Sequence, residues 1–210
     1  MAGQNNTVEL IGTYGSDLLH GLSAWTSTSR ELSQEKRDRL PKLLNMLGEE
    51  GHHTPYEKSM IHFLVTTDIA THIHLLKHRI GVSINGESAR YKELKDDKFY
   101  VPVDWDDEEQ TQYIAFLEDA LQKYHQCLAR LVAKGVDRKR AKESARFYLP
   151  YGNQITADIS FNWRSFMHFQ ELRNSPHAQL EVRELAQEML RLVRETNNFP
   201  LSLKAFGYLP

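Results

Sequence analysis

The feature that most constrains the fold is a long stretch of apolar side chains at helical spacing near the middle of the chain. Residues 113–132 place an apolar side chain at about every third or fourth position, which is the period of one face of an α-helix. The acidic run 104–109 suits the positive end of a helix dipole, and Gly135 suits a helix C-terminus. The sequence therefore predicts one long amphipathic helix that ends at Gly135.

Other patterns predict strands on both sides of this helix. Residues 155–161 alternate apolar and polar side chains, as a strand with one buried face does. Residues 58–67 are rich in β-branched and aromatic side chains, which also favours a strand. A looser alternation covers residues 8–14. Shorter helices are expected at 17–23, at 138–147 after a capping Asp137, at 162–171 after a capping Asn162, and from about 178 to 194.

Few strands and long helices in irregular order do not match the regular alternation of a doubly wound sheet. We therefore predict the α+β class, with a small, mostly antiparallel sheet covered by long helices in a single domain. The 210 residues are 40% hydrophobic, enough for a sizeable core. No repeat or Pro/Gly/Ser-rich linker divides the chain, so one domain over residues 1–210 is the simplest interpretation.

Three segments before residue 80 carry more local predictions. The apolar residues 43–47, after Pro41, predict a helix that stops at Gly48 or Gly51. Residues 51–57 are rich in Gly, Pro and polar groups, which is typical of an ordered loop. Asp68 is expected to cap a helix whose last turn holds the basic residues 77–79.

Composition excludes several functional classes. The net charge of −2 argues against a nucleic-acid-binding protein and against binding to an anionic membrane surface. No apolar run approaches the roughly 20 residues that span a bilayer, and no basic segment followed by an apolar one begins the chain. We therefore expect no membrane partner and a cytoplasmic location. The single cysteine, Cys127, excludes an intramolecular disulfide and fits a reducing compartment.

Three polar clusters are candidates for chemistry. The first combines the basic residues 77–79 with the polar segment 85–90, and it suits either a phosphate ligand or a solvated helix end. The second, residues 52–57, contains adjacent histidines, which rarely point at one metal ion, so we expect no metal site. The third, residues 162–177, suits helix capping and surface ion pairs. No Gly-rich phosphate loop and no Gly-x-Ser-x-Gly motif accompanies them.

The same clusters resemble a known family. The order Lys77-His78-Arg79, eight residues and then Ser88-Ala89-Arg90-Tyr91 resembles the signature of flavin-dependent thymidylate synthases, usually Arg-His-Arg, seven or eight residues and Ser. His52-His53-Thr54-Pro55-Tyr56-Glu57 resembles the family's His-x-(Ser/Thr)-Pro-Phe-Glu segment. Asn162-x-Arg164, Leu172-Arg173 and His177-Ala178-Gln179 resemble its C-terminal flavin-binding segment. The three matches occur in the family's order and span most of the chain.

The resemblance implies a methyltransferase of nucleotide biosynthesis, a flavoprotein that makes dTMP. It implies that the partners are dUMP, folate and NADPH, with FAD bound between the subunits of a homotetramer. dUMP would receive its carbon from 5,10-methylenetetrahydrofolate, with NADPH as the reductant. Hydride would come from reduced flavin and no cysteine would act as nucleophile. Cys127, which the helical pattern predicts to be buried and unreactive with a raised thiol pKa, is compatible with that chemistry.

The resemblance also implies roles for individual residues. Catalytic roles fall on His52 and Arg173. Contacts with the cofactor fall on Ser27, Thr54, Glu57, Arg79, Asn85, Glu87, Asn162, Arg164, His168, Leu172 and His177. Contacts with the substrate fall on His74, Lys77, Glu87, Ser88, Ala89, Arg90, Arg146 and Arg173.

Three positions depart from the family pattern. Lys77 replaces the first arginine of the signature, so a bidentate fork becomes a point charge. His168 stands where the family often has Asn, and His74 where it often has Gln. Both changes would affect the pH dependence of activity, because histidine is the side chain that changes charge most readily near physiological pH. Two alternative functions remain: a flavin reductase acting with another nucleotide, and a non-catalytic nucleic-acid-binding module.

Overall fold

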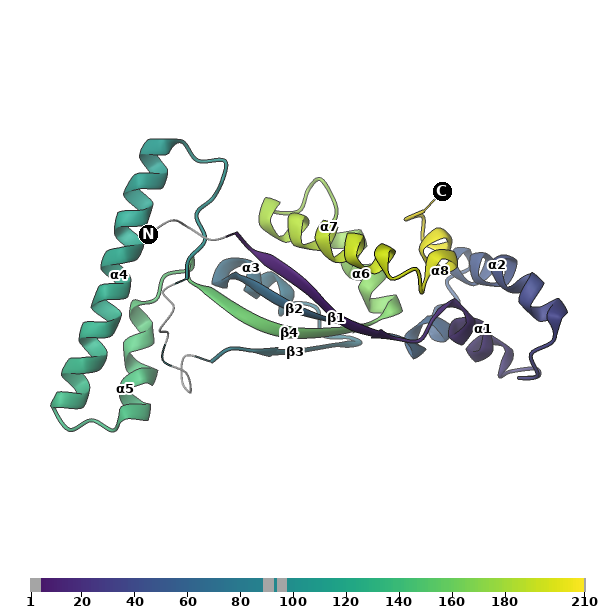
Figure 1. Cartoon of the computed structure of the whole chain (residues 1–210), viewed down its shortest axis with the longest axis horizontal. Coiled ribbons are helices and arrows are strands. Elements are labelled where there is room, and N and C mark those ends of the chain that lie inside the picture. The colour runs from purple at the N-terminus through teal and green to yellow at the C-terminus, as the bar shows by residue number, and fades with distance from the viewer. Residues whose placement is uncertain (1–4, 89–92, 94–97, 210) are drawn as a thin grey trace. The chain divides into compact units, whose positions relative to one another are not determined.

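The computed structural model describes residues 5–88, 93 and 98–209. It confirms the α+β class, with helices and a four-stranded antiparallel sheet (Figure 1). In chain order the elements are β1 Thr7–Tyr14, α1 Asp17–Trp25, α2 Gln34–Glu49, the 3-10 helix η1 Thr54–Lys58, β2 Met60–Asp68, α3 Ile69–Leu75, β3 Val82–Gly86, α4 Asp107–Ala133, α5 Arg138–Ala145, the 3-10 helix η2 Arg146–Tyr148, β4 Gln154–Asn162, α6 Trp163–Arg173, α7 Leu180–Glu195 and α8 Pro200–Ala205.

The sheet has the strand order β1-β2-β4-β3, so β1 and β3 are its edge strands. Strand β2 buries Ile61, Phe63 and Val65 at alternating positions, and β4 repeats this pattern from Ala157 to Phe161. Because successive side chains of a strand point to opposite faces, each of these strands has one apolar face and one more polar face. The period-two pattern in the sequence is therefore confirmed.

The chain divides into two units by the contacts its residues make. The first unit takes its described residues from Met1–Thr7, Val65–Lys77 and Asn85–Ala157. The second comprises Val8–Leu64, His78–Ile84 and the described part of Asp158–Pro210. Strands β2 and β4 supply residues to both units. The assignment of residues 1–210 to one functional domain stays a prediction.

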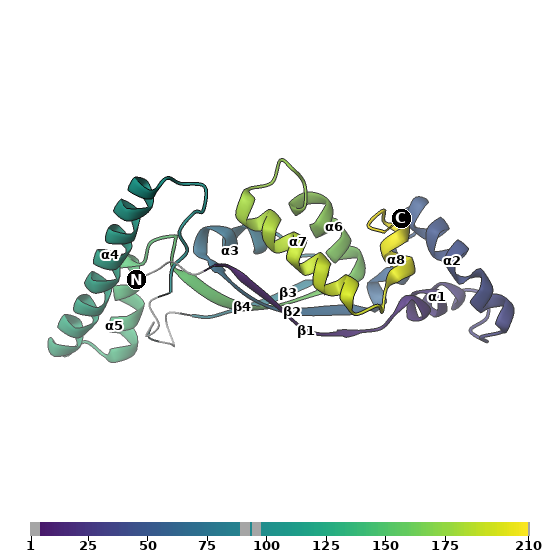
Figure 2. The ribbon, with the colours of Figure 1, turned by 45° about the horizontal axis from the view of Figure 1, so that its top comes forward.

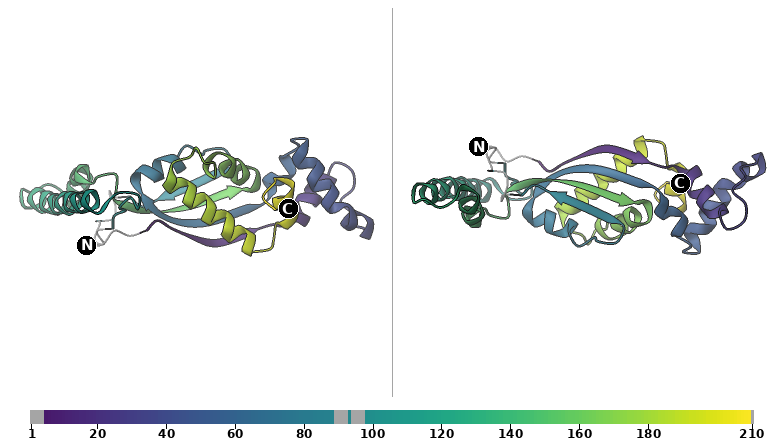
Figure 3. Two further views of the ribbon diagram at one scale, coloured as in Figure 1. Left: turned by 90° about the horizontal axis from the view of Figure 1, so that it is seen from above. Right: turned by 90° about the horizontal axis from the view of Figure 1, so that it is seen from below.

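In the second unit, α6 and α7 lie side by side on one face of the strands (Figures 1 and 2). Aromatic rings of α6 meet those of the sheet, with ring centroids 5.8 Å apart for Phe63 and Phe166 and 5.3 Å apart for Phe161 and Phe169. Each fully buried phenylalanine contributes about 1.5–3 kcal/mol to folding. In the view from below in Figure 3, these strands lie in front, and none of the described helices covers that second face.

The remaining helices of the second unit, α1, α2 and α8, pack on one another. A Cβ atom at Gly48 would lie 2.8 Å from the carbonyl oxygen of Ala205, so only glycine permits this approach of α2 to α8. Tyr56 of η1 is fully buried and donates a hydrogen bond of 2.6 Å to the carbonyl oxygen of Leu44. These contacts fix η1, and with it the second polar cluster, against α2.

A buried polar network joins α1, α8 and the start of β2. The carboxylate of Asp17 accepts hydrogen bonds from the backbone of Leu201 and Ser202 and from the Ser202 hydroxyl, and thereby caps α8. His20 Nδ1 lies 2.9 Å from the Ser202 hydroxyl and its Nε2 lies 2.8 Å from the Ser59 hydroxyl. Because the Ser202 proton goes to Asp17, Nδ1 of His20 carries the ring proton. Burial lowers the pKa of His20 to about 3, so the ring is neutral at physiological pH.

In the first unit, α4 and α5 form an antiparallel pair (Figure 1). Their interface buries Tyr124 and Leu128 of α4 against Ala141 and Ala145 of α5. Asp106 caps α4 by accepting a hydrogen bond from the backbone of Glu109. The prediction of one long helix here is confirmed. Cys127 packs against the same interface but is only partly buried, so the prediction of a buried thiol is wrong.

Helix α2 begins earlier than predicted and contains Pro41 in its interior. Its N-terminus is set by Ser33, whose hydroxyl accepts from the backbone of Lys36 at 3.3 Å. Leu40 and Leu44 are buried on one face, on both sides of the proline. This packing offsets the hydrogen bond that proline cannot donate. The helix runs through Gly48 and ends at Glu49, just before Gly51 with its φ of 71°, so Gly51 is the correct one of the two predicted stops.

Three other local features differ from what the sequence indicates. Helix α3 ends at Leu75, so the basic residues 77–79 follow the helix and do not form its last turn. Residues 82–86 form the edge strand β3, which the sequence did not indicate because only Val82 and Ile84 alternate with polar side chains there. Residues 54–58 form a 3-10 helix where a loop was expected, since Pro55 favours the first turn of a helix.

Candidate functional site

The segment between α3 and β3 is fixed to the N-terminus of α6 in the second unit. Asn162 caps α6 by accepting from the backbone of Ser165 at 2.8 Å, and its own backbone N–H donates to the carbonyl of Gly81 at 2.9 Å. The Ser165 hydroxyl donates to the carbonyl of Ile80 at 2.7 Å. Gly81 has φ of 64°, and a Cβ there would lie 2.3 Å from Asn162 Nδ2. Asn162, for which the family resemblance implies a contact with the flavin, therefore also has a structural role.

Arg173, at the end of α6, contacts the same segment. Its Nε lies 2.9 Å from Nε2 of His78. His78 packs edge-on against the ring of Phe169, with centroids 5.0 Å apart. Burial, followed by the positive charge of Arg173 and the effect of His168, lowers the pKa of His78 to about 4. The arginine thus donates its Nε hydrogen to a neutral imidazole, which does not offset the positive charge of the guanidinium.

One face of α6 presents polar and apolar groups to solvent. Arg164, His168 and Leu172 are exposed at four-residue spacing, which places them in one row. Nη1 of Arg164 lies 3.0 Å from a carboxylate oxygen of Glu57 in η1. This ion pair joins the second polar cluster to the third, which the sequence alone did not show. His168 lies 3.5 Å from Glu171 on its own helix.

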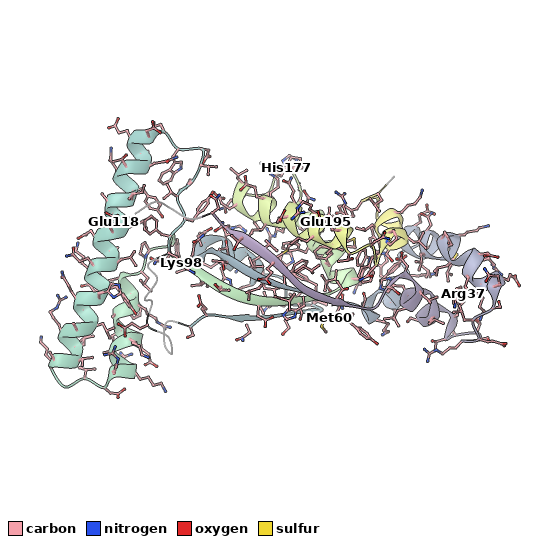
Figure 4. The ribbon with its side chains drawn as sticks, in the orientation of Figure 1. Arg37, Met60, Lys98, Glu118, His177 and Glu195 are labelled. Carbon is pink, nitrogen blue, oxygen red and sulfur yellow. The ribbon has the colours of Figure 1, made fainter. Side chains whose placement is uncertain are left out.

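Four other expected site residues of the second unit are exposed. His52 lies 3.7 Å from Glu50, and the hydroxyl of Ser27 donates to the carbonyl of Ala24 within its own turn. Thr54 begins η1. His177 lies in the connection between α6 and α7, as Figure 4 shows. No hydrogen bond or ion pair of the described residues joins the side chain of one of these four to another expected site residue.

Two expected site residues of the first unit, Asn85 and Glu87, lie in or next to β3. Glu87 donates its backbone N–H to the carbonyl of Thr156 at 2.8 Å, and its carboxylate accepts from the backbone N–H of Thr156 at 2.9 Å. Asn85 lies in β3 and is exposed, whereas Glu87 is partly buried. The carboxylate of Glu87 is thus held against β4 by the backbone.

Of the remaining expected site residues, His74 lies in the last turn of α3, Lys77 follows that helix, and Ser88 follows β3. His74 and Ser88 are partly buried, and Lys77 is exposed. Arg146 opens η2 and is exposed, while Arg79 of the second unit is also exposed. Ala89 and Arg90 lie outside the described residues. Exposed arginine side chains suit an anionic ligand, because the guanidinium fork matches phosphate oxygens.

Sequence reasoning missed two residues of this region. His78 lies within the Lys77-His78-Arg79 signature, but neither the sequence pattern nor the family resemblance assigns it a contact. Ser165 was not singled out, although a serine three residues after a capping Asn162 is well placed to bond the neighbouring chain. The sequence feature that could have drawn attention to His78 is its position between two cationic residues. Only the fold shows that it meets Arg173.

Residues 5–88, 93 and 98–209 contain no group of three or more His, Cys, Asp or Glu side chains arranged to hold a metal ion. The helices among the same residues are too short or too polar to cross a bilayer.

The comparisons of this chain with known proteins all lead to the same family. The family described as thymidylate synthase complementing protein matches residues 9–200. Flavin-dependent thymidylate synthase of Kosmotoga olearia is 31% identical over 95% of this chain and 89% of its own length. The enzyme of the same name from Streptomyces avermitilis is 30% identical over 96% of this chain and 90% of its own.

Solved structures give the same result. The UMP/dUMP methylase PolB of Streptomyces cacaoi, bound with 5-Br dUMP, has a TM-score of 0.80 and 28% identity over 99% of this chain and 97% of its own. Its structure with 5-Br UMP has a TM-score of 0.78 over 98% and 96% of the two chains. The relatives are named as enzymes, which favours an enzyme over a non-catalytic nucleic-acid-binding module. With its signature, its fold and these likenesses, the chain belongs to the flavin-dependent thymidylate synthase family.

Proposed function

We propose that this protein methylates dUMP to dTMP, with FAD as its flavin, 5,10-methylenetetrahydrofolate as the carbon donor and NADPH as the reductant. The overall reaction converts dUMP, 5,10-methylenetetrahydrofolate, NADPH and a proton into dTMP, tetrahydrofolate and NADP⁺. The observation that carries the proposal is the arrangement of Arg173, whose Nε is bonded to His78. In the part of the chain that the structure describes, no carboxylate pairs with this arginine.

Arg173 is our proposed catalytic group for the pyrimidine. Attack on the uracil ring places negative charge on its oxygens, and a fixed guanidinium lowers the energy of that charge. Without a carboxylate partner, no nearby negative charge offsets the attraction of the guanidinium for the charge on the pyrimidine. We assign His52, which is exposed beside η1, to the same reacting cavity.

The residues of α6 and η1 fit a flavin dinucleotide chemically. FAD carries a diphosphate, which needs cationic donors, and a ring system with polar edges. Arg164 and Arg79 are exposed cations, and Glu57 holds the Arg164 side chain in one orientation at 3.0 Å. We assign the cofactor to these residues. The assigned set also includes Ser27, Thr54, Asn85, Glu87, Asn162, His168, Leu172 and His177. When bound and reduced, the flavin supplies the hydride.

The nucleotide is assigned to the residues around β3 and the end of α5. Ser88 offers a neutral donor, and Arg146 and Lys77 offer charge for a phosphate. Glu87 is oriented by the Thr156 backbone and suits an N–H or hydroxyl of the substrate. His74, Ala89, Arg90 and Arg173 complete the assignment. The likeness to a methylase bound with 5-Br dUMP supports this nucleotide class.

The assembly is proposed to be a homotetramer with active sites between subunits. The support from this chain is the face of the second unit's strands that none of the described helices covers (Figure 3). Ile11 of β1 and Met60 of β2 are 48% and 51% exposed, and each alternates with more buried neighbours, which places it on the strand face opposite those neighbours. Exposed apolar side chains on a sheet face are typical of an interface. The cytoplasmic location expected from the sequence stays a prediction.

The deciding experiment follows the flavin and the product separately. Purified protein is expected to bind FAD, with the yellow absorbance of an oxidised flavin, and to form dTMP only when dUMP, 5,10-methylenetetrahydrofolate and NADPH are all present. Arg173→Ala is expected to abolish dTMP formation while FAD still binds.

Three outcomes would contradict parts of this proposal. If the protein cannot be loaded with FAD, the cofactor assignment fails. If it oxidises NADPH but forms no dTMP, the flavin reductase alternative is correct. If Arg173→Ala makes dTMP at the normal rate, the role of that arginine is wrong.

A further inference from the structure

We propose that His78 is the positioning residue of this site: its neutral imidazole accepts a hydrogen bond from Arg173 and thereby fixes the direction in which the arginine presents its charge. The inference rests on the proposed function, because it takes Arg173 as the group that meets the nucleotide. It adds a role for the middle residue of the Lys77-His78-Arg79 signature.

The geometry determines which atom donates. An arginine Nε carries a hydrogen and has no acceptor capacity, so His78 Nε2 must be the acceptor in the 2.9 Å contact. The ring proton of His78 is then on Nδ1. A doubly protonated imidazole has no acceptor and would repel the guanidinium. The contact therefore requires a neutral His78.

The surroundings of His78 keep the ring neutral. It is partly buried and its ring packs edge-on against Phe169. The charged or titratable groups that act on it are Arg173 and His168, both on α6, and both lower its pKa further, after burial. With a pKa of about 4, His78 remains an acceptor throughout the neutral range.

The position of His78 is itself set by α6. The two residues that follow Arg79 are bonded to the start of that helix, through Ser165 to the carbonyl of Ile80 and through the Asn162 backbone to Gly81. Arg173 lies at the end of the same helix. The first turn of α6 thus fixes the signature segment, and the segment contacts α6 again at Arg173, the last residue of the helix.

The consequence for Arg173 is a restricted guanidinium. The group is planar, so a bond at Nε limits rotation of the plane and leaves Nη1 and Nη2 as a fork on the side away from His78. Arginine has high side-chain entropy, and a group that is already oriented loses less on binding. His78 therefore acts on dUMP through Arg173 and need not touch the nucleotide.

The test compares His78→Leu with His78→Gln in the full-length, FAD-loaded protein. Both side chains are similar in size to histidine and can pack against Phe169, but only glutamine retains an acceptor. We expect His78→Leu to lower kcat/KM for dUMP by about 10-fold to 100-fold, the order of magnitude for a misplaced catalytic group. We expect His78→Gln to remain within about 3-fold of the wild type.

Two further measurements separate positioning from a general structural effect. In an Arg173→Ala background, His78→Leu should cause no further loss of dUMP affinity by calorimetry, because coupled residues are not additive. His125→Ala is the matched control, since this partly buried histidine of α4 also makes an edge-on ring contact, 4.9 Å from Tyr124. It should leave dUMP affinity unchanged.

The inference is overturned if folded, flavin-loaded His78→Leu has wild-type affinity and kcat/KM, if His78→Gln is as impaired as His78→Leu, or if the losses from His78→Leu and Arg173→Ala add. If His78→Leu does not fold, the comparison of His78→Gln with His78→Lys replaces it, because lysine cannot accept the bond and should show the loss. Absence of dTMP in the wild type would instead refute the proposed function, while the calorimetric cycle would still test the contact.

Discussion

At the scale of the residue, an ion pair between the second and third polar clusters gives a direct test of flavin binding. Glu57 and Arg164 are exposed enough that their pair contributes only ~0–1 kcal/mol to stability. We therefore expect Glu57→Gln to leave the melting temperature nearly unchanged while it weakens FAD binding by about 10-fold, because Arg164 loses its fixed orientation. FAD titration followed by fluorescence quenching measures this.

The matched control is Glu188→Gln. Glu188 pairs with Arg191 on the exposed side of α7, and we assign neither residue to the flavin. An equal loss of FAD affinity in both variants would show that the effect is general electrostatics and not positioning of Arg164.

The single cysteine provides a second residue-scale prediction. Cys127 lies in α4 and packs on the α4–α5 interface. We expect Cys127→Ala to keep the wild-type kcat within about 2-fold and to lose at most ~1 kcal/mol of stability, since the side chain is only partly buried. Complete loss of dTMP synthesis in a folded variant would contradict a mechanism without a thiol nucleophile.

At the scale of the element, Gly81 determines whether the signature segment can meet α6. Its φ of 64° is unfavourable for other residues, and a Cβ would also collide with Asn162 and Ser165. We expect Gly81→Ala to lower the free energy of unfolding by more than ~2 kcal/mol, the sum of backbone strain and a lost helix cap. Urea denaturation measures it.

Gly135→Ala separates the two contributions. This glycine has φ of 83°, but nothing lies within 4 Å of the position of its added Cβ. It should therefore show the strain alone, about 1 kcal/mol. Equal losses in both variants would mean that the contacts of Gly81 with α6 contribute nothing.

The network between α1 and α8 predicts a pH dependence of stability. The pKa of His20 is lowered to about 3 in the folded state, against an ordinary value of 6.5. Between these values the unfolded chain binds the proton and the folded chain does not, so the stabilisation is complete above about pH 6.5 and is lost as the pH falls toward 3. The slope approaches ~1.4 kcal/mol per pH unit.

This contribution is isolated by comparing the wild type with His20→Gln at pH 7 and pH 5. The wild type should lose more stability than the variant between the two values, as measured by urea midpoints. The pKa of Asp17 is also shifted, upward by burial, but this carboxyl is present in both proteins. Identical pH profiles would contradict a neutral, buried His20.

At the scale of the whole molecule, the uncovered sheet face predicts self-association. Ile11→Glu combined with Met60→Glu places two charges on this face, and a desolvated, unpaired charge is costly. If the protein is the proposed homotetramer, we expect the double variant to shift to smaller species by light scattering, with its secondary structure preserved. Arg37→Glu, on α2 at the position labelled in Figure 4, changes the charge without touching the face and should stay tetrameric. A tetrameric double variant would contradict this interface.

The sequence by itself determined the elements whose pattern is local. The long amphipathic period became α4, the alternation at residues 155–161 became β4, and Asp68, Asp137 and Asn162 are the caps that their positions suggested. These predictions are confirmed because periodicity and capping depend on near neighbours in the chain. The signature motifs likewise pointed to the family without the fold.

Only the tertiary structure decided the rest. Helix α2 continues through Pro41 because leucines on both sides of it are buried, and β3 exists because β4 offers it a partner. The pairs Glu57 with Arg164 and His78 with Arg173 join residues 107 and 95 positions apart. The sequence around one residue of a pair does not indicate the other residue. Such contacts follow from how the sheet and α6 pack and not from spacing along the chain.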